Sequence, residues 1–97
     1  MLKQETFFLL DPKHTDRANI KKEREKAKKL KKTTWWLTRL QQRLCYYCQN
    51  KFPSHELTMD HIVPIARGGR STKGNIVTSC LNCNRGKKLK IPAETYL

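Results

Sequence analysis

The sequence predicts a small α+β fold, in which a strand, a loop, a second strand and a helix follow N-terminal helices. The cysteines form two Cys-x-x-Cys pairs, Cys45 with Cys48 and Cys80 with Cys83. Between these pairs hydrophobic and polar residues alternate as in strands, and a helical pattern follows the second pair. The chain has 97 residues, of which 37% are hydrophobic, so we expect one small domain with a small core.

The two cysteine pairs leave no cysteine over. A Cys-x-x-Cys turn can direct both sulfurs at one tetrahedral ion, and two such turns complete a closed shell of four thiolates. We therefore expect one structural Zn²⁺ per chain on Cys45, Cys48, Cys80 and Cys83. Disulfides are disfavoured because no secretory signal is visible, and a redox role would explain one pair only. A core this small often needs such a site, and bound zinc can contribute on the order of 10 kcal/mol to folding.

Two helices are expected before the first cysteine. Residues 15–33 contain good helix formers and no Gly or Pro, and Thr15 or Asp16 can cap their start. The pair Thr33-Thr34 can cap a second helix over residues 35–44. The apolar residues of the second helix fall at helical spacing, so we expect them to pack on the zinc core. They are Trp36, Leu37, Leu40 and Leu44.

The remaining elements surround a central loop. Residues 56–60 alternate like a strand, and residues 75–79 form the second expected strand. Between them, the Gly68-Gly69 pair indicates a loop. A helix is expected from Leu81 to about Lys90, ended by Pro92. Near the N-terminus, we expect Phe7 to Leu10 to form a strand or a short, loosely packed apolar segment.

The charge indicates a polyanionic partner. The chain has 21 Lys and Arg against 8 Asp and Glu, a formal net charge of +13. Such an excess of positive charge attracts nucleic acid. The alternative explanations of the charge are a surface that is merely solvated and attraction to acidic lipid. A membrane partner is disfavoured because the chain shows no clear apolar helix face beside its lysines. The run Phe7 to Leu10 is also too short for a membrane span or a signal sequence, so we expect an intracellular, cytoplasmic protein.

Much of this charge lies near the N-terminus. We expect residues 1–33 to form a basic, helical arm and residues 34–97 to form the main domain. The apolar residues Ile20, Ala27 and Leu30 are too sparse to bury a full helix face. Contact with nucleic acid and a solvated helix without a dedicated role both remain open for this segment. We expect deletion of residues 1–32 to weaken nucleic-acid binding and to leave the candidate catalytic residues intact, because those residues all follow residue 33.

The region from Cys45 to Lys88 resembles the HNH endonucleases that contain a structural zinc site. The resemblance lies in both cysteine pairs, the Gly-Gly pair and three further motifs. These motifs are Asp60-His61-Ile62-Val63-Pro64, the strand that begins at Asn75, and Asn84-Arg85-Gly86-Lys87. The resemblance implies a ββα-metal nuclease fold. It also implies metal-dependent hydrolysis of DNA that leaves 5′-phosphate and 3′-hydroxyl ends.

By this resemblance His61 is the general base, Asp60 and Asn84 are ligands of the catalytic metal, and Asn75 holds the loop and orients the histidine. The last motif often has a histidine where this chain has Asn84, and the asparagine variant is also familiar in the family. The chemistry of these side chains agrees with the assignment. Histidine titrates near neutral pH and can take a proton from water, and two oxygen ligands favour Mg²⁺ or Mn²⁺ over Zn²⁺.

Basic residues near these motifs are expected to contact DNA phosphates, which position a duplex without reading its sequence. They are Arg67, Arg70, Lys73, Arg85, Lys87 and Lys88. His14 and His55 have no comparable partners and are expected at the surface. The expected partner is double-stranded DNA, and a homodimer is possible because one site cuts one strand. The alternatives are a non-catalytic zinc module that binds nucleic acid through its basic arm, and a zinc module for protein interaction.

Overall fold

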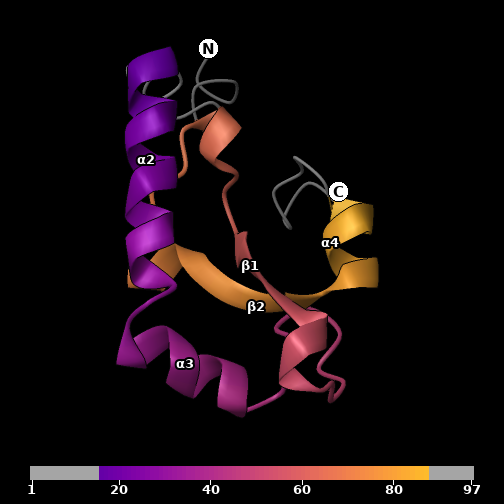
Figure 1. Ribbon diagram of the computed structural model, residues 1–97. Coiled ribbons are helices and arrows are strands. Elements are labelled where there is room, and N and C mark those ends of the chain that lie inside the picture. Colours follow the sequence, from indigo (N-terminus) through magenta and orange to yellow (C-terminus); the bar gives the residue numbers. More distant parts are fainter. Residues whose placement is uncertain (1–15, 88–97) are drawn as a thin grey trace.

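The computed structural model describes residues 16–87 and shows an α+β fold, which confirms the predicted class (Figure 1). Two helices precede a two-stranded antiparallel sheet, and a third helix follows it directly. The elements are α2 (Arg17–Leu30), α3 (Thr34–Gln41), β1 (Leu57–His61), β2 (Ile76–Cys80) and α4 (Leu81–Lys87). In the part of the chain so described, no helix has the length and apolar character needed to cross a membrane.

Both N-terminal helices begin at the predicted caps. The Asp16 carboxylate accepts a hydrogen bond of 2.9 Å from the backbone N–H of Asn19, and the Thr33 hydroxyl accepts one of 3.3 Å from that of Trp36. These bonds satisfy N–H groups that have no partner inside the helix. The helix α3 ends at Gln41, three residues earlier than expected. Arg43 adopts a positive φ of 54°, a left-handed conformation that is incompatible with a continuing α-helix.

The register of the sheet decides which sequence motifs lie together. Leu57 pairs with Cys80, and His61 pairs with Ile76, so the His61 end of β1 lies beside the start of β2. The cysteine-bearing end of β2 runs directly into α4. A strand pair in this register therefore places the candidate base at one end of the hairpin and the cysteines at the other.

Both strands begin and end one residue later than predicted. Glu56 and Asn75, the expected first residues, instead close the 3₁₀ turns Ser54–Glu56 and Lys73–Asn75. These turns use their backbone groups locally, for example in the bond of 2.9 Å from the N–H of Asn75 to the carbonyl of Thr72. Alternation of residue types does not reveal such a turn, because one turn residue continues the alternating pattern.

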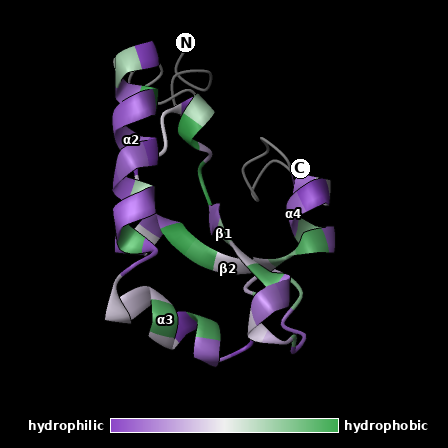
Figure 2. Cartoon of the chain, viewed as in Figure 1, coloured by the Kyte–Doolittle hydropathy of each residue, from purple (hydrophilic) through white to green (hydrophobic). Residues whose placement is uncertain are grey.

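The core is small and lies around the cysteines. Cys45, Leu57 and Cys80 are buried together, and Leu40 packs against this cluster. Figure 2 shows the contrast between α2, which is hydrophilic along most of its length, and the more hydrophobic β2. Of the four residues expected to pack here, Leu40 does so, whereas Trp36 is buried outside this cluster. The expectation for Leu37 is wrong, since it is 50% exposed. The helix α3 is too short to bury more than one stripe of its surface.

The helix α2 packs through a charged residue. Its buried residues are Glu23 and Ala27, and the helix lies against the 3₁₀ turn Ile65–Arg67, which follows the His61 motif. The apolar stripe is indeed too sparse to bury a face, and a buried carboxylate takes its place. The partners of that carboxylate are part of the candidate site.

Candidate active site

The four cysteines meet in one cluster. Their sulfur atoms all lie within 4.8 Å of one another, and Sγ of Cys48 is 4.0 Å from Sγ of Cys80. Cys45 and Cys48 come from the turn after α3, Cys80 ends β2, and Cys83 lies in the first turn of α4. The hairpin between the two pairs returns the chain to its starting point, so four soft ligands surround one position. This cluster could hold a metal ion such as zinc.

Backbone groups in the cluster stabilise a thiolate. Burial alone would raise the pKa of Cys45, but N–H groups of Cys48, Cys80 and Tyr47 bond to its sulfur and lower the pKa to about 7. The bond from Cys80 is 3.4 Å long. Burial and hydrogen bonds among the neighbouring thiols raise the pKa of Cys83 to about 12. Amide groups aimed at a sulfur suit a metal-bound thiolate, which carries the negative charge that they favour.

His61, at the end of β1, is held through one ring nitrogen. Its Nε2 lies 2.9 Å from Oγ of Ser71, and that hydroxyl donates a bond of 2.6 Å to the backbone carbonyl of Glu23. A carbonyl can only accept, so the single proton of Ser71 is used there. Oγ of Ser71 must then accept from Nε2–H of His61. The neutral ring therefore has its lone pair on Nδ1.

The ring is also kept neutral by its surroundings. Burial is the largest influence and lowers the pKa of His61 below its ordinary value of 6.5, opposed by the carboxylate of Asp60 and assisted by the ammonium of Lys87. A neutral imidazole with an available lone pair is the form in which a histidine accepts a proton.

Glu23 fixes Ser71 from the helix α2. Its Oε1 accepts a bond of 2.7 Å from the backbone N–H of Ser71, and its Oε2 lies 3.3 Å from Nζ of Lys26. Burial would raise the pKa of Glu23, but these donors lower it, so the carboxylate stays ionised. No role was expected from the sequence for Glu23 or Ser71. The only available signal was an acidic residue inside a lysine-rich helix, and Glu25 shares that signal.

Asn75 ties together the loop that follows His61. Its Oδ1 accepts a bond of 2.9 Å from the N–H of Val63, and its Nδ2 donates to the carbonyls of Val63 (3.1 Å) and Arg70 (2.8 Å). Gly69 allows the same loop to close, because a Cβ at this position would lie 1.8 Å from the carbonyl oxygen of Val63. Both ends of the Asn75 amide thus face backbone groups of the loop.

Asp60 is held from two sides. The hydroxyl of Tyr47, between the first two cysteines, donates a bond of 2.5 Å to Oδ2 of Asp60. Nζ of Lys87 lies 3.5 Å from the same oxygen and donates a bond of 2.9 Å to the carbonyl of His61. Burial and the bond to Asp60 raise the pKa of Tyr47, so its hydroxyl remains a donor. Lys87, expected at a DNA phosphate, is turned inward, with its side chain 6% exposed.

Asn84 lies on the Asp60 side of β1. Its Nδ2 donates a bond of 2.9 Å to the hydroxyl of Thr58. Side chains two residues apart share one face of a strand, so Thr58 and Asp60 both face α4. Met59 and His61 lie on the opposite face and border a cavity together with residues of α2. The structure therefore brings Asp60 and Asn84 to one face of β1 and directs His61 toward the other, at the strand end.

The other expected site residues are spread over the surface. Arg70, Lys73 and Arg85 are exposed and Arg67 is partly exposed, while Nζ of Lys73 lies 5.7 Å from the ring centre of Trp35. Lys88 and His14 lie outside the described residues.

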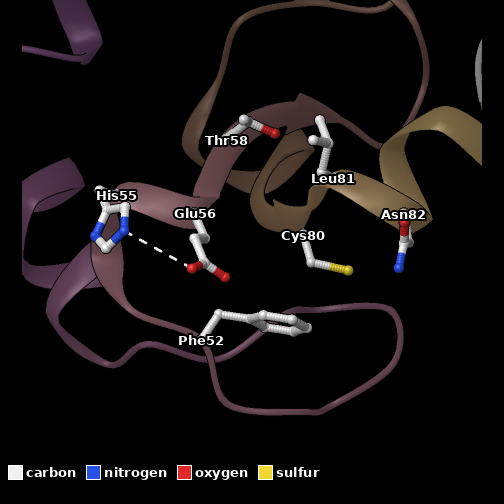
Figure 3. A pocket seen from close by; sticks show the side chains of 7 residues that line it. All are labelled: Phe52, His55, Glu56, Thr58, Cys80, Leu81 and Asn82. Atoms are coloured by element: carbon white, nitrogen blue, oxygen red, sulfur yellow. Dashed lines mark ion pairs between the residues drawn. The ribbon is translucent and has the colours of Figure 1, made fainter.

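His55 is at the surface, as expected. Its side chain is 80% exposed, and its Nε2 lies 3.7 Å from a carboxylate oxygen of Glu56. Figure 3 shows this pair at the edge of a pocket that Phe52, Thr58 and Leu81 also line. His55 is therefore a natural control for His61.

This combination of a strand pair, a following helix, an oriented histidine and a cysteine cluster agrees with the comparison with known families. The model of the HNH endonuclease family matches residues 45–96, more than half of the chain. The chain belongs to the HNH endonuclease family, and this membership supports nuclease activity.

A stretch of 44 residues is also similar to part of a CRISPR-associated endonuclease, Cas9 of Actinomyces naeslundii, with 43% identity. The matched stretch covers 44% of this chain and 4% of that protein. The similarity therefore concerns a small portion of the relative and says nothing of its other parts.

Proposed function

We propose that this protein is a metal-dependent endonuclease that hydrolyses phosphodiester bonds in double-stranded DNA. The observation that supports this most is His61 at the end of β1, held through Nε2 by Ser71, with Asp60 as its chain neighbour. Membership of the HNH endonuclease family supports the same reaction class.

His61 acts as the general base in this proposal. Because Nε2 carries the proton that Ser71 accepts, Nδ1 is the atom that takes a proton from the attacking water. General-base assistance of this kind contributes about 10²–10⁴-fold to a rate. Asn75 keeps the loop closed behind the histidine through its three bonds to Val63 and Arg70. Asn75 is thus a positioning residue.

Asp60 and Asn84 would hold the catalytic ion. Asp60 lies on the face of β1 that is turned toward α4, and Asn84 lies on α4 and bonds to Thr58 on that face. Both offer oxygen ligands, which suit Mg²⁺ or Mn²⁺. When bound, such an ion neutralises phosphate charge and stabilises the leaving oxygen. Tyr47 and Lys87 both contact Oδ2 of Asp60, so the direction of the carboxylate is set before substrate arrives.

The cysteine cluster has a structural role in this proposal, because four thiolates around one Zn²⁺ leave no open position for water or substrate. The surface residues Arg67, Arg70, Lys73 and Arg85 are proposed as phosphate contacts. For Lys87 we propose a positioning role at Asp60 in place of a phosphate contact. Four expectations from the sequence stay predictions. They are a phosphate contact by Lys88, a domain boundary after residue 33, a homodimer and a cytoplasmic location.

Supercoiled plasmid tests the function. Purified protein should nick or linearise it with Mg²⁺ and should not with EDTA. His61→Ala should abolish cleavage while retaining DNA binding and zinc, whereas the control His55→Ala should cut like the wild type. Salt-dependent DNA binding without cleavage by the wild type would instead favour a non-catalytic zinc module that binds nucleic acid.

A further inference from the structure

A cavity of about 250 Å³ opens between α2 and the end of β1. Met59, His61 and Ile65 line one side of it. The α2 side is lined by three cations, Arg24, Lys28 and Lys31, which we call the cation stripe. The candidate base and a set of positive side chains therefore border one space, although the helix lies outside the residues that the family model matches.

The cation stripe follows one face of the helix. Positions 24, 28 and 31 are related by i, i+4 and i+7, which places them above one another on a helix surface. All three residues are exposed. Among the described residues that line the cavity none is acidic, and the nearby Glu23 is buried against Ser71. The stripe is thus a row of positive charge, and Glu23 beside it is already paired with Ser71. The exposed Glu25 lies on the other side of Arg24 and Lys28, where it lines a separate pocket with them, and it does not line this cavity.

We propose that the cation stripe binds the phosphates that flank the bond to be cut, with the DNA backbone lying along α2 across the mouth of this cavity. Seven helical residues rise about 10.5 Å, and a DNA strand advances 3.4 Å per nucleotide, so the stripe spans about three phosphates. This proposal rests on the proposed function, because it uses His61 to locate the scissile bond. The sequence left open whether this helix contacts nucleic acid or is only solvated. The proposal assigns DNA contact to the face with the cation stripe and solvation to the opposite face.

The opposite face of α2 provides a matched control. Lys22 and Lys29 are exposed and lie roughly 130–150° around the helix axis from the stripe. Lys28→Ala/Lys31→Ala and Lys22→Ala/Lys29→Ala remove the same charge from the same helix. Alanine favours the helix in both cases. Circular dichroism and zinc content would verify the fold of each variant, and Lys28→Arg/Lys31→Arg keeps the charge of the stripe.

Binding is measured with the full chain by fluorescence anisotropy of a short labelled DNA duplex, in buffer without Mg²⁺, Mn²⁺ or chelator, over a range of salt concentrations. Leaving out the catalytic ion prevents cleavage and leaves the structural zinc in place, so binding is read whether or not the protein is a nuclease. The zinc content is measured after the titration. The stripe variant should lower the slope of log K against log[salt] by about 1.8, about 0.9 for each lost phosphate contact. The control variant should keep the wild-type slope, and the arginine variant should keep it as well.

Equal losses of slope in the stripe and control variants would overturn the proposal, since net charge alone would then explain binding. An unchanged slope in the stripe variant would overturn it too and leave α2 as a solvated helix. In plasmid cleavage, the stripe variant should show a raised KM and the control variant an unchanged KM. Absence of cleavage by the wild type would count against the proposed function, whereas the difference between the two slopes would still decide whether the stripe contacts DNA.

Discussion

Ser71 lies between the candidate base and the N-terminal helix, with its Oγ 2.9 Å from Nε2 of His61 and 2.6 Å from the backbone oxygen of Glu23. This short chain of bonds makes α2 part of the support of the active site, because the acceptor that fixes the Ser71 proton belongs to the helix. Glu23 and Ser71 are 48 positions apart in the sequence. The helix α2 thus carries positive charge and also contacts the residue that holds the candidate base.

Replacing Ser71 by alanine should lower kcat for plasmid cleavage about 10-fold, the equivalent of one hydrogen bond of roughly 1.4 kcal/mol. Without the acceptor at Nε2, the His61 ring loses its preferred tautomer, so ¹⁵N NMR of His61 should change from the Nε2–H form toward a mixture. Ser71→Thr keeps the hydroxyl and should keep both readouts. Wild-type rates together with an unchanged tautomer in Ser71→Ala would rule out the positioning role.

Activity should fall on the acid side with a midpoint below pH 6.5. Burial holds the pKa of His61 below its ordinary value of 6.5, and the neutral ring is the form that we propose as the base. As the pH falls through the lowered pKa, the ring gains a proton and can no longer accept one from water. The measurement is kcat/KM with Mg²⁺ from about pH 5 to 8. A midpoint above pH 7 that His55→Ala leaves in place would contradict this prediction.

The protein should contain about one zinc per chain when purified without added zinc, since four cysteine sulfurs lie within 4.8 Å of one another. Cys80→Ser should lose both the metal and cooperative unfolding, because Cys80 also belongs to the buried cluster with Leu57. Metal analysis and thermal unfolding provide the two readouts. Cooperative unfolding of a zinc-free sample would refute the structural role of the metal.

Mg²⁺ and Mn²⁺ should support cleavage, and Zn²⁺ alone should not, because Asp60 and Asn84 offer hard oxygen ligands. Asp60→Ala should remove activity, while Glu56→Ala should keep it, since Glu56 is an exposed carboxylate paired with His55. Rates are compared at limiting Mg²⁺, where a lost ligand has its largest effect. Normal cleavage by Asp60→Ala under that condition would show that the ligand assignment is wrong.

Deleting residues 1–32 should reduce kcat as well as DNA binding. From the sequence we expected such a deletion to leave the site intact, but Glu23 accepts two hydrogen bonds from Ser71 and would be lost with the deleted residues. Rates at saturating DNA separate the two effects, and circular dichroism establishes that the shortened chain folds. A well-folded truncated protein with the kcat of the full chain would show that α2 acts through charge alone.

The sequence by itself determined the elements whose signals are local. Two Cys-x-x-Cys turns, the motif around Asp60 and His61, and the caps at Asp16 and Thr33 each depend on residues within a few positions of one another. Such patterns predicted the α+β class and placed both strands to within one residue. The cysteine cluster was predictable too, because one ion requires four ligands to meet wherever they lie in the chain.

Only the tertiary structure decided which side chains meet across the fold. Lys87 and Arg85 look alike in sequence, yet the side chain of Lys87 turns inward to Asp60 while Arg85 is exposed, because α4 lies along β1 with one face. The pairing of Ser71 with Glu23 likewise follows from the way α2 lies against the loop after His61. Composition and periodicity describe neighbours along the chain, whereas a hydrogen bond depends on the positions of two atoms in space, and that relation exists only once the helix and the loop have packed together.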